Sequence, residues 1–433
     1  MLLTEVQTAH IPEIYEEFCS VIGENHWKKR VANLNQEIKG NRFLKDFLYQ
    51  EYNIAYQLEN LRELKEKFHY FPPQELNNRS NYAAVSFAAQ SLSIIKAAPK
   101  DFSEKFKRRI HGAFKNPGDM RGLRLEIKAA THFTIRGLKI SWPEMTGIDR
   151  FDLLVEGLGT RVLEIECKSI SSDKGRKIHQ REILDFYNLL MPELSIVKKS
   201  LSTGLAAVLT IPGRLPTQYK DRRELARRIS SQILIAKNTT FIDGAHIRFS
   251  EFDLSMLDSG NLKSNQKILR ETIDSLTGTL NREAMLIGTS AGGAFALVIQ
   301  SEEDDKLLST IFDTLSDSAK KQFSRNQGGM FLVGLHGISA DQLTSIATQD
   351  NDSSQQSSAL RIEVSEFLSS NERDHVIGVG FLSENDLPQV SEFTVESSGS
   401  AYFFPKKESS LWSNDFSNLF NWRDSEPTIQ KIY

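Results

Sequence analysis

The chain has 433 residues, a formal net charge of −3, and hydrophobic and charged fractions of 39% and 25%, which are typical of a globular protein with two or three domains. No apolar run is long enough for a membrane helix, and the first residues lack the basic and apolar segments of a signal peptide. The two cysteines, Cys19 and Cys167, are far apart in sequence, which excludes a disulfide framework and paired zinc ligands. We therefore expect a cytoplasmic protein without a membrane partner.

Residues 1–115 are predicted to form a helical N-terminal region. Apolar residues recur at helical spacing over 31–68, and the Phe-Pro-Pro segment at 71–73 ends this pattern, because proline does not continue a helix. An alanine-rich stretch at 81–97 predicts a further packed helix.

Residues 116–254 show a different pattern, in which helices and strands alternate. Helices are expected at 122–137, 177–190 and 219–236, and strands at 138–143, 151–157, 160–170, 204–211 and 245–252. A tight Gly-Leu-Gly joins the two strands within 151–170 and predicts a hairpin. This mixed order predicts an α/β or α+β sheet covered by helices on both faces.

Residues 255–433 are predicted to form a mixed α/β C-terminal domain. A hairpin is expected at 284–300, helices at 306–323 and 339–347, and strands at 328–337, 375–383 and within 390–405. The sequence contains no internal repeat.

Three charged residues, Glu164, Glu166 and Lys168, alternate with apolar residues along the strand expected at 160–170. Successive side chains of a strand point to opposite faces, so the three charges share one face and the apolar side chains share the core-facing one. Buried charges are costly unless they are paired, hydrogen-bonded or bound to a metal. The pattern therefore indicates a functional site in this strand.

Asp152, on the preceding strand, can supply another carboxylate to the same place. A hairpin register that brings Asp152 beside Glu166 creates a pair of hard oxygen ligands, which suits Mg²⁺ or Mn²⁺. The ammonium group of Lys168 would point into the same space, where it could orient an attacking water and neutralise charge that develops on a phosphate. The residues thus predict a magnesium or manganese site suited to phosphate chemistry.

These residues resemble the PD-(D/E)XK nuclease superfamily of restriction-endonuclease-like enzymes. The resemblance is carried by Asp152 and by the tripeptide Glu166-Cys167-Lys168, and the superfamily's core order, αβββαβ, is the order expected over 122–211. Glu126, in the first of these helices, matches an acidic residue that the superfamily often has there. The resemblance covers about 120–250 and neither end of the chain.

The resemblance implies a metal-dependent nuclease that hydrolyses phosphodiester bonds of nucleic acid, with DNA expected rather than RNA. Asp152, Glu166 and the backbone carbonyl of Cys167 would bind Mg²⁺ or Mn²⁺, and Lys168 would orient the attacking water. The superfamily's roles include restriction, antiviral defence and repair.

Two further carboxylates have implied roles at this site. Glu126 would complete the outer coordination or bind a second metal through water. Glu164 would hold a second ion or pair with Lys168.

A homodimer is expected, because enzymes of this kind cut two strands with two sites. The sequence has no P-loop, so any translocation along DNA would need a helicase or another partner protein.

Positive charge is concentrated around these residues. Segment 96–237 has 28 Lys and Arg against 16 Asp and Glu, whereas the rest of the chain has 25 against 40. A basic block between acidic flanks predicts a polyanion partner. The residues expected at the start of the next helix, where a phosphate backbone could lie, are Lys174, Arg176, Lys177 and Arg181.

Two other functions stay open at this point. The first is a catalytically inactive nucleic-acid-binding or interaction protein on the same fold. The second is a serine esterase, because 288–292 fits the nucleophile-elbow pattern Gly-x-Ser-x-Gly with Ser290 as nucleophile. An elbow needs a helix after the serine and a histidine partner; the residues after Ser290 favour a strand, and the downstream histidines are His336 and His375.

Overall fold

The computed structural model describes residues 6–76, 79–257, 266–278, 283–384, 389–391, 394–395, 399–420 and 429–431. The chain forms two compact units. Unit 1 comprises 1–34, 49–174 and 307–433, and unit 2 comprises 35–48 and 175–306. The chain therefore divides at points other than the expected boundaries at 115/116 and 254/255, because most of unit 2 interrupts the sequence of unit 1.

The N-terminal region is helical. Its helices are α1 (Ile11–Ile22), α2 (Asn25–Gly40), α3 (Leu44–Glu51), α4 (Asn53–Phe68), α5 (Pro73–Leu76), α6 (Tyr82–Ala97), α7 (Lys100–Ala113) and α8 (Pro117–Ile135). The helical pattern over 31–68 is interrupted after Gly40, where the Asn41 side chain accepts the backbone N–H of Phe43 at 3.0 Å and competes with the helical hydrogen bonds. α8 begins earlier than expected, because the Asn116 side chain caps its first turn.

Unit 1 contains a seven-stranded mixed sheet in the order β1-β2-β3-β9-β10-β13-β14. Its strands are β1 (Lys139–Ser141), β2 (Leu153–Leu158), β3 (Arg161–Ile170), β9 (Gly328–Leu335), β10 (Val376–Leu382), β13 (Ser400–Pro405) and β14 (Ile429–Lys431). β3, β9 and β10 run parallel to one another, and the other neighbouring pairs are antiparallel. The expected hairpin is confirmed as the pair β2–β3, in which Leu153 lies opposite Ile165 and Leu154 opposite Glu164.

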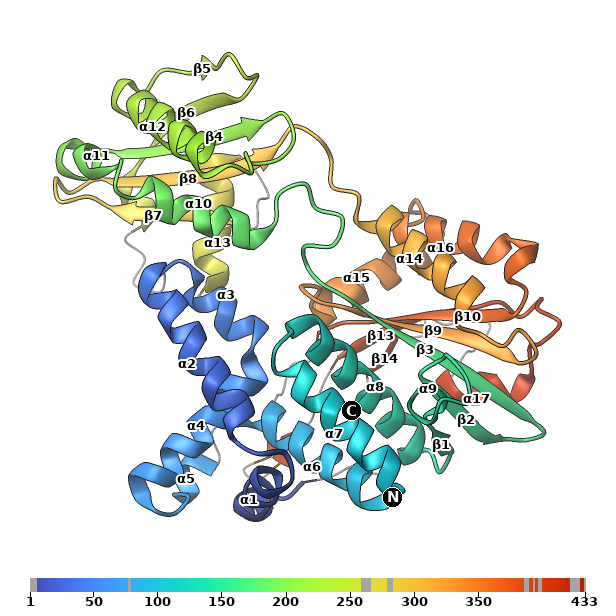
Figure 1. The fold of residues 1–433 in the computed structure, drawn as a ribbon. Helices are drawn as coiled ribbons and strands as arrows, with labels where there is room; N and C mark the ends of the chain where they lie inside the picture. The colour runs from blue at the N-terminus through green and yellow to red at the C-terminus, as the bar shows by residue number, and fades with distance from the viewer. Residues whose placement is uncertain are drawn as a thin grey trace. The chain divides into compact units, whose positions relative to one another are not determined.

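Helices cover both faces of this sheet (Figure 1). The helices of the later part of unit 1 are α14 (Leu307–Lys321), α15 (Ala340–Asn351), α16 (Ala359–Ser369) and α17 (Ser417–Phe420). On one face, Ile311 of α14 belongs to the same buried apolar cluster as Val333 of β9. On the other face lies α8, since a Cβ atom at Gly334 would meet the Leu125 side chain at 3.3 Å. Val333 and Gly334 thus face opposite layers, as expected for neighbours in a strand.

Unit 2 contains a five-stranded mixed sheet in the order β5-β6-β4-β8-β7. Its elements are α10 (Gln180–Leu190), α11 (Ser195–Ser200), β4 (Gly204–Ile211), α12 (Tyr219–Ile235), β5 (Thr239–Thr240), β6 (His246–Phe252), α13 (Gln266–Thr277), β7 (Ala284–Gly288) and β8 (Ala294–Ser301). The hairpin expected at 284–300 is confirmed as the antiparallel pair β7–β8. The expectation that 204–211 supplies the last strand of an αβββαβ core is wrong, because β4 pairs with β6 and β8 in this second sheet.

The strand that lies beside β3 comes from much later in the sequence. β9 pairs with β3 in parallel along the whole of Gly328–Leu335, and α14 precedes it. With unit 2 set aside, the order of the main elements is α8, β1, β2, β3, α14, β9, and a short helix, α9 (Pro143–Thr146), lies between β1 and β2. The fold is therefore mixed α/β, and part of the expected C-terminal domain completes the sheet that contains the hairpin.

Two short strands, β11 (Gln389–Ser391) and β12 (Thr394–Val395), pair separately from both sheets. No helix in the described part of the chain combines the length and the apolar composition that a membrane span needs.

Candidate functional site

Four acidic side chains that the sequence singles out are buried in unit 1. Their exposed fractions are 8% for Asp152, 3% for Glu126, 2% for Glu164 and 3% for Glu166. A buried carboxylate must be protonated, paired or hydrogen-bonded to be tolerated. The surroundings of each carboxylate therefore indicate what it can do.

Asp152 lies just before β2 and is tied to β3. Its Oδ2 atom accepts the backbone N–H of Cys167 at 2.7 Å. Because Leu153 and Leu154 face Ile165 and Glu164, the same register continues to Asp152 beside Glu166. The hairpin thus brings the two predicted ligands together.

Glu166 lies on β3, and its two carboxylate oxygens have different surroundings. Its Oε1 atom accepts a hydrogen bond from Lys168 Nζ at 2.6 Å, and the two side chains form an ion pair. Its Oε2 atom is buried and has no hydrogen-bond partner within the described residues. A buried carboxylate oxygen without a partner is costly, so this atom is poised to accept a donor or to bind a cation.

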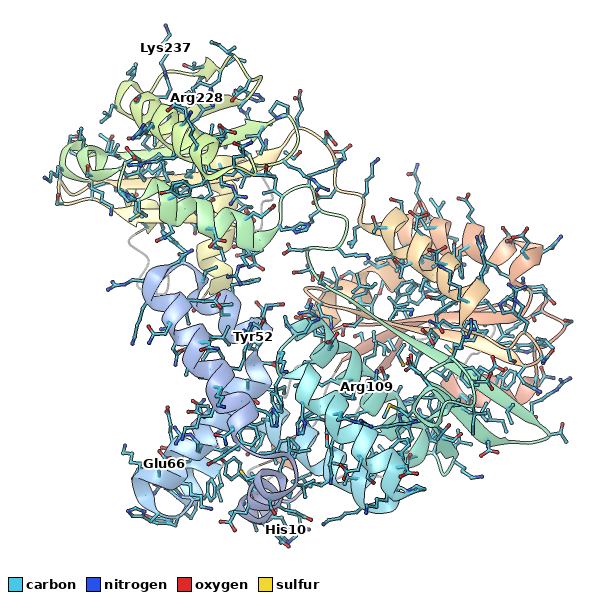
Figure 2. The ribbon with its side chains drawn as sticks, viewed as in Figure 1. His10, Tyr52, Glu66, Arg109, Arg228 and Lys237 are labelled. Atoms are coloured by element: carbon cyan, nitrogen blue, oxygen red, sulfur yellow. The ribbon has the colours of Figure 1, made fainter. Side chains whose placement is uncertain are left out.

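Glu126 forms an ion pair with Arg109, a residue that no sequence pattern marks as its partner. Arg109 projects from α7 (Figure 2), and its guanidinium forms two hydrogen bonds with the carboxylate, one of them between Nη1 and Oε2 at 2.6 Å. This two-point geometry is the strong form of the Arg–carboxylate pair. Both oxygens of Glu126 are engaged, which fits a supporting role better than direct binding of a metal.

Glu164 lies two residues before Glu166 on β3 and has a partner of its own. Its partner is Ser324, a residue that follows α14. The Glu164 carboxylate accepts hydrogen bonds from the Ser324 backbone N–H, at 2.9 Å, and from the Ser324 hydroxyl. Burial raises the pKa of Glu164. The Ser324 hydrogen bonds oppose this rise, and the charge of Asp149 adds to it. Glu164 thus joins β3 to the loop before β9, and it is not paired with Lys168.

Asp152 is the electrostatic centre of the group. Burial, and then the neighbouring Asp152, raises the pKa of both Glu126 and Glu166 to about 8. Burial raises the pKa of Asp152 itself to about 6, and Glu144 adds to this, whereas the Cys167 N–H, Arg109 and Lys168 oppose it. Such mutual repulsion in a buried place is a frequent property of functional sites.

Three of the four predicted phosphate-contacting residues lie close to acidic side chains. Lys174, Arg176 and Lys177 precede α10, which begins at Gln180, so the expectation that they start that helix is wrong. Within unit 2, Lys177 pairs with Glu303, and Arg176 lies 3.9 Å from Asp305. Arg181, in the first turn of α10, pairs with Glu37 at 2.6 Å. Acidic residues of unit 2 therefore neutralise Arg176, Lys177 and Arg181 in part.

Ser290 lies in the loop of the β7–β8 hairpin. Its hydroxyl donates to the carbonyl of Lys198 at 2.9 Å. A strand, and not a helix, follows the loop, so the strand–turn–helix geometry of a nucleophile elbow is not present at Ser290.

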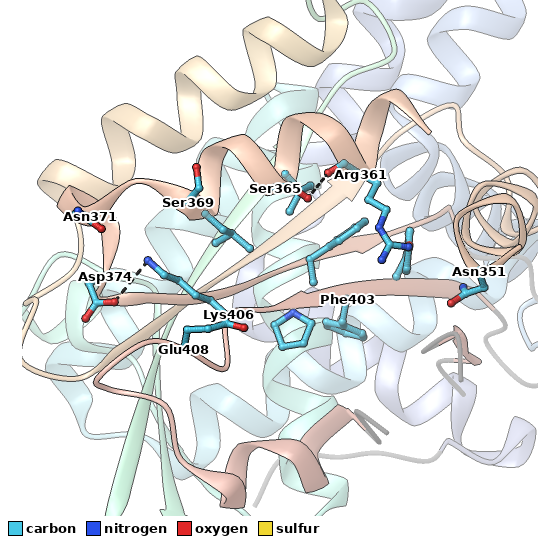
Figure 3. Close-up of a pocket in the computed structure, with 14 residues that line it drawn as sticks. Asn351, Arg361, Ser365, Ser369, Asn371, Asp374, Phe403, Lys406 and Glu408 are labelled. Carbon is cyan, nitrogen blue, oxygen red and sulfur yellow. Dashed lines mark hydrogen bonds and ion pairs between the residues drawn. The ribbon is translucent and has the colours of Figure 1, made fainter. Parts of the chain in front are cut away.

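A pocket of about 630 Å³ lies in unit 1 between α16 and β13, away from the predicted site residues (Figure 3). Arg361 lies toward one end, and at the other end Lys406 points toward Asp374, 3.5 Å away. The pocket contains none of the carboxylates described above.

In the part of the chain that the structure describes, no three His, Cys, Asp or Glu side chains gather in a way that could hold a metal ion. The candidate ligands are thus the pair Asp152 and Glu166 with nearby backbone, and not a larger acidic cluster. Comparisons with protein-family models, curated proteins and solved structures find no match to this chain.

Proposed function

We propose that this protein is a metal-dependent nuclease of the restriction-endonuclease-like kind, which hydrolyses phosphodiester bonds of nucleic acid at Asp152, Glu166 and Lys168. The observation that carries the proposal is the Glu166 carboxylate, which has a lysine on one oxygen, no partner among the described residues on the other, and Asp152 beside it. A buried arrangement of this kind is costly unless it serves a ligand.

The order of elements in unit 1 supports the same proposal. The sequence α8, β1, β2, β3, α14, β9 reproduces αβββαβ, with β9 parallel to β3 and unit 2 inserted between β3 and α14. Glu126 lies in the first helix of this order, and the Glu166-Cys167-Lys168 tripeptide lies in the third strand. The proposed core therefore differs from the one expected from sequence only in its last helix and strand.

Asp152, Glu166 and the backbone carbonyl of Cys167 fit a Mg²⁺ or Mn²⁺ ion. In an extended strand the N–H and C=O of one residue point to the same edge, so the Cys167 carbonyl lies on the side where its N–H meets Asp152. Three oxygen donors from carboxylate and carbonyl groups suit these hard cations. When bound, such an ion supplies Lewis acidity and lowers the pKa of a bound water.

The protein's own groups prepare this site for a phosphate. Lys168 holds its ammonium against Glu166, from where it can donate a hydrogen bond that orients a water for attack on phosphorus. Arg109 balances the charge of Glu126, and the Cys167 N–H fixes the orientation of Asp152. These contacts hold the ligands in place before substrate arrives, which is the arrangement that preorganised sites require.

Nucleic acid is the proposed substrate, with DNA favoured over RNA. The excess of Lys and Arg in 96–237 supports a polyanion partner, although several of these cations are paired within the protein. We further propose a cytoplasmic homodimer that acts in restriction, antiviral defence or repair, if needed with a helicase or another partner protein.

Incubation of the full chain with supercoiled plasmid tests this proposal. Nicked or linear DNA should form with Mg²⁺ or Mn²⁺ and should not form with EDTA, and Lys168→Ala should be inactive. Binding to the plasmid without cleavage under any of these metals would favour the alternative, a catalytically inactive nucleic-acid-binding protein on the same fold.

A further inference from the structure

A serine, a histidine and a glutamate meet at one edge of the seven-stranded sheet. Ser169 is the last residue but one of β3, His336 directly follows β9, and Glu384 follows β10, so the three come from the carboxyl ends of three neighbouring parallel strands. The Ser169 Oγ lies 3.0 Å from His336 Nε2, and His336 Nδ1 lies 3.7 Å from Glu384 Oε1. The carboxyl ends of parallel strands are where α/β sheets commonly bind ligands.

Backbone hydrogen bonds hold this group in register. The N–H of His336 donates to the Ile170 carbonyl at 3.0 Å, and the N–H of Gly337 donates to Glu384 Oε1 at 2.9 Å. The interaction with His336 lowers the pKa of Glu384, and the Gly337 N–H and the charge of Arg124 act in the same direction, so the carboxylate is ionised at neutral pH. An ionised acid on Nδ1 and a serine on Nε2 are the order of groups that activates a serine hydroxyl.

Solvent can reach the group. The side chains of His336 and Glu384 are 30% and 40% exposed, and Ser169 is half-buried. In the β3–β9 register Ser169 lies opposite Gly334, so β9 places no side chain beside the serine. Arg124, on α8, interacts electrostatically with Glu384 and brings positive charge to the same edge.

We propose that Ser169, His336 and Glu384 form a second, metal-independent hydrolytic site for carboxylic esters, distinct from the carboxylates around Asp152. Ser169 Oγ attacks the ester carbonyl carbon while His336 Nε2 accepts the hydroxyl proton. As the tetrahedral intermediate collapses, the bond to the leaving alkoxide breaks, and His336 returns the proton to it as an alcohol. Water then attacks the acyl-serine in the same way and releases the carboxylic acid and free Ser169.

Glu384 acts in this scheme as a positioning residue, because its carboxylate lies on the Nδ1 side of His336 and not beside the serine. The serine proposed here is Ser169, which no sequence motif marks, and not Ser290, whose hydroxyl is hydrogen-bonded to a backbone carbonyl. His336, one of the two downstream histidines, contacts Ser169, and His375 instead contacts the Ala319 carbonyl.

Labelling with a fluorophosphonate probe, read by intact mass and peptide mapping, tests the site in the full chain. We expect one adduct per chain, located on Ser169, in EDTA. His336→Gln should slow labelling by about 100-fold or more, and Ser290→Ala and His375→Gln should label as the wild type does. No adduct, or an adduct on another residue, would overturn the proposal, and this readout needs no variant to fold.

Hydrolysis of p-nitrophenyl acetate in EDTA gives a second readout. Ser169→Ala should lower kcat/KM by about 100-fold or more, and Glu384→Gln should lower kcat while it leaves KM unchanged. His375→Gln should retain full esterase activity, because His375 contacts the Ala319 carbonyl and not Ser169. Activity that persists in EDTA separates this site from the proposed metal-dependent nuclease. Wild-type rates in Ser169→Ala, with circular dichroism unchanged, would contradict the assignment.

Discussion

The backbone N–H of Cys167 donates a 2.7 Å hydrogen bond to Oδ2 of Asp152, and so a residue before β2 is fixed against β3. This contact places Asp152 where it is the acidic neighbour with the largest effect on the pKa of both Glu126 and Glu166. The pKa values of the three carboxyl groups therefore depend on one another, and a change at Asp152 should shift the pKa of both Glu126 and Glu166.

Glu166→Gln and Lys168→Ala should each lower the rate of plasmid cleavage by about 100-fold or more. The first removes the charge of a proposed metal ligand, and the second removes the ammonium group proposed to orient the attacking water. The fold should persist, because Gln keeps the shape of Glu and the Lys168 side chain is partly exposed. Cleavage rates and circular dichroism of the purified variants measure both effects. Ser171→Ala, outside the proposed site, is a control that should cut normally. Full activity in both site variants would show that the wrong residues have been assigned.

The stability of the metal-free protein should depend on pH through the buried carboxylates. Folding raises the pKa of Asp152 to about 6 and that of Glu126 and Glu166 to about 8, from ordinary values of 3.8 and 4.5. The native state therefore binds more protons than the unfolded state, so the stabilisation is complete at acidic pH and is lost as pH rises toward 8.

Urea denaturation in EDTA between about pH 5 and pH 8 measures this effect. The free energy of unfolding should fall across this range, and Glu166→Gln should reduce the fall because the amide does not titrate. Mn²⁺ should restore stability most at the upper end, where the ligands are deprotonated. A free energy of unfolding that rises with pH would contradict the predicted shifts.

Removal of Arg109 should destabilise unit 1 strongly. At a pH above about 8, where Glu126 is ionised, Arg109→Met leaves this buried carboxylate without its cation, at a cost of about 3–5 kcal/mol, as is usual when one partner of a buried ion pair is lost. The double variant Arg109→Met/Glu126→Leu should recover most of that loss, because no buried charge is left unpaired. Chemical denaturation of the single and double variants compares the two. Equal destabilisation in both would mean that packing, and not charge, is what Arg109 contributes.

The cations that precede and begin α10 should affect DNA binding only modestly. Lys177 and Arg181 are already paired with Glu303 and Glu37, so DNA must displace these partners before it gains phosphate contacts. Lys177→Ala/Arg181→Ala should reduce the slope of log affinity against log salt by no more than about 2. Fluorescence anisotropy with labelled duplex at several salt concentrations gives that slope. A larger reduction would place these residues at the centre of the interface.

The local parts of the fold could be predicted from sequence, and the long-range parts could not. The hairpin β2–β3 and the face shared by Glu166 and Lys168 follow from strand alternation and a tight turn between neighbouring segments. The last strand of the core did not, because Gly204–Ile211 and Gly328–Leu335 are both eight-residue strands that are buried along their length. Local pattern does not distinguish which of them joins β3.

The same limit applies to the side-chain partners. Arg109 and Glu126 lie on different helices, and Ser169 and His336 are separated by 167 positions, so no spacing rule connects them. Only charges within one hairpin, such as Asp152 and Glu166, carried a signal that sequence could reveal, because their register is set by the turn.

Calorimetric titration of Mn²⁺ into the wild type, Asp152→Asn and Glu164→Gln is the most direct test of the proposed metal site, because it needs neither substrate nor turnover. Asp152 lies next to Glu166, whose Oε2 atom has no hydrogen-bond partner among the described residues. Glu164, in contrast, is hydrogen-bonded to Ser324. We predict that the wild type and Glu164→Gln bind Mn²⁺ with similar affinity and that Asp152→Asn does not bind it. Loss of binding in Glu164→Gln together with retained binding in Asp152→Asn would contradict the site described here.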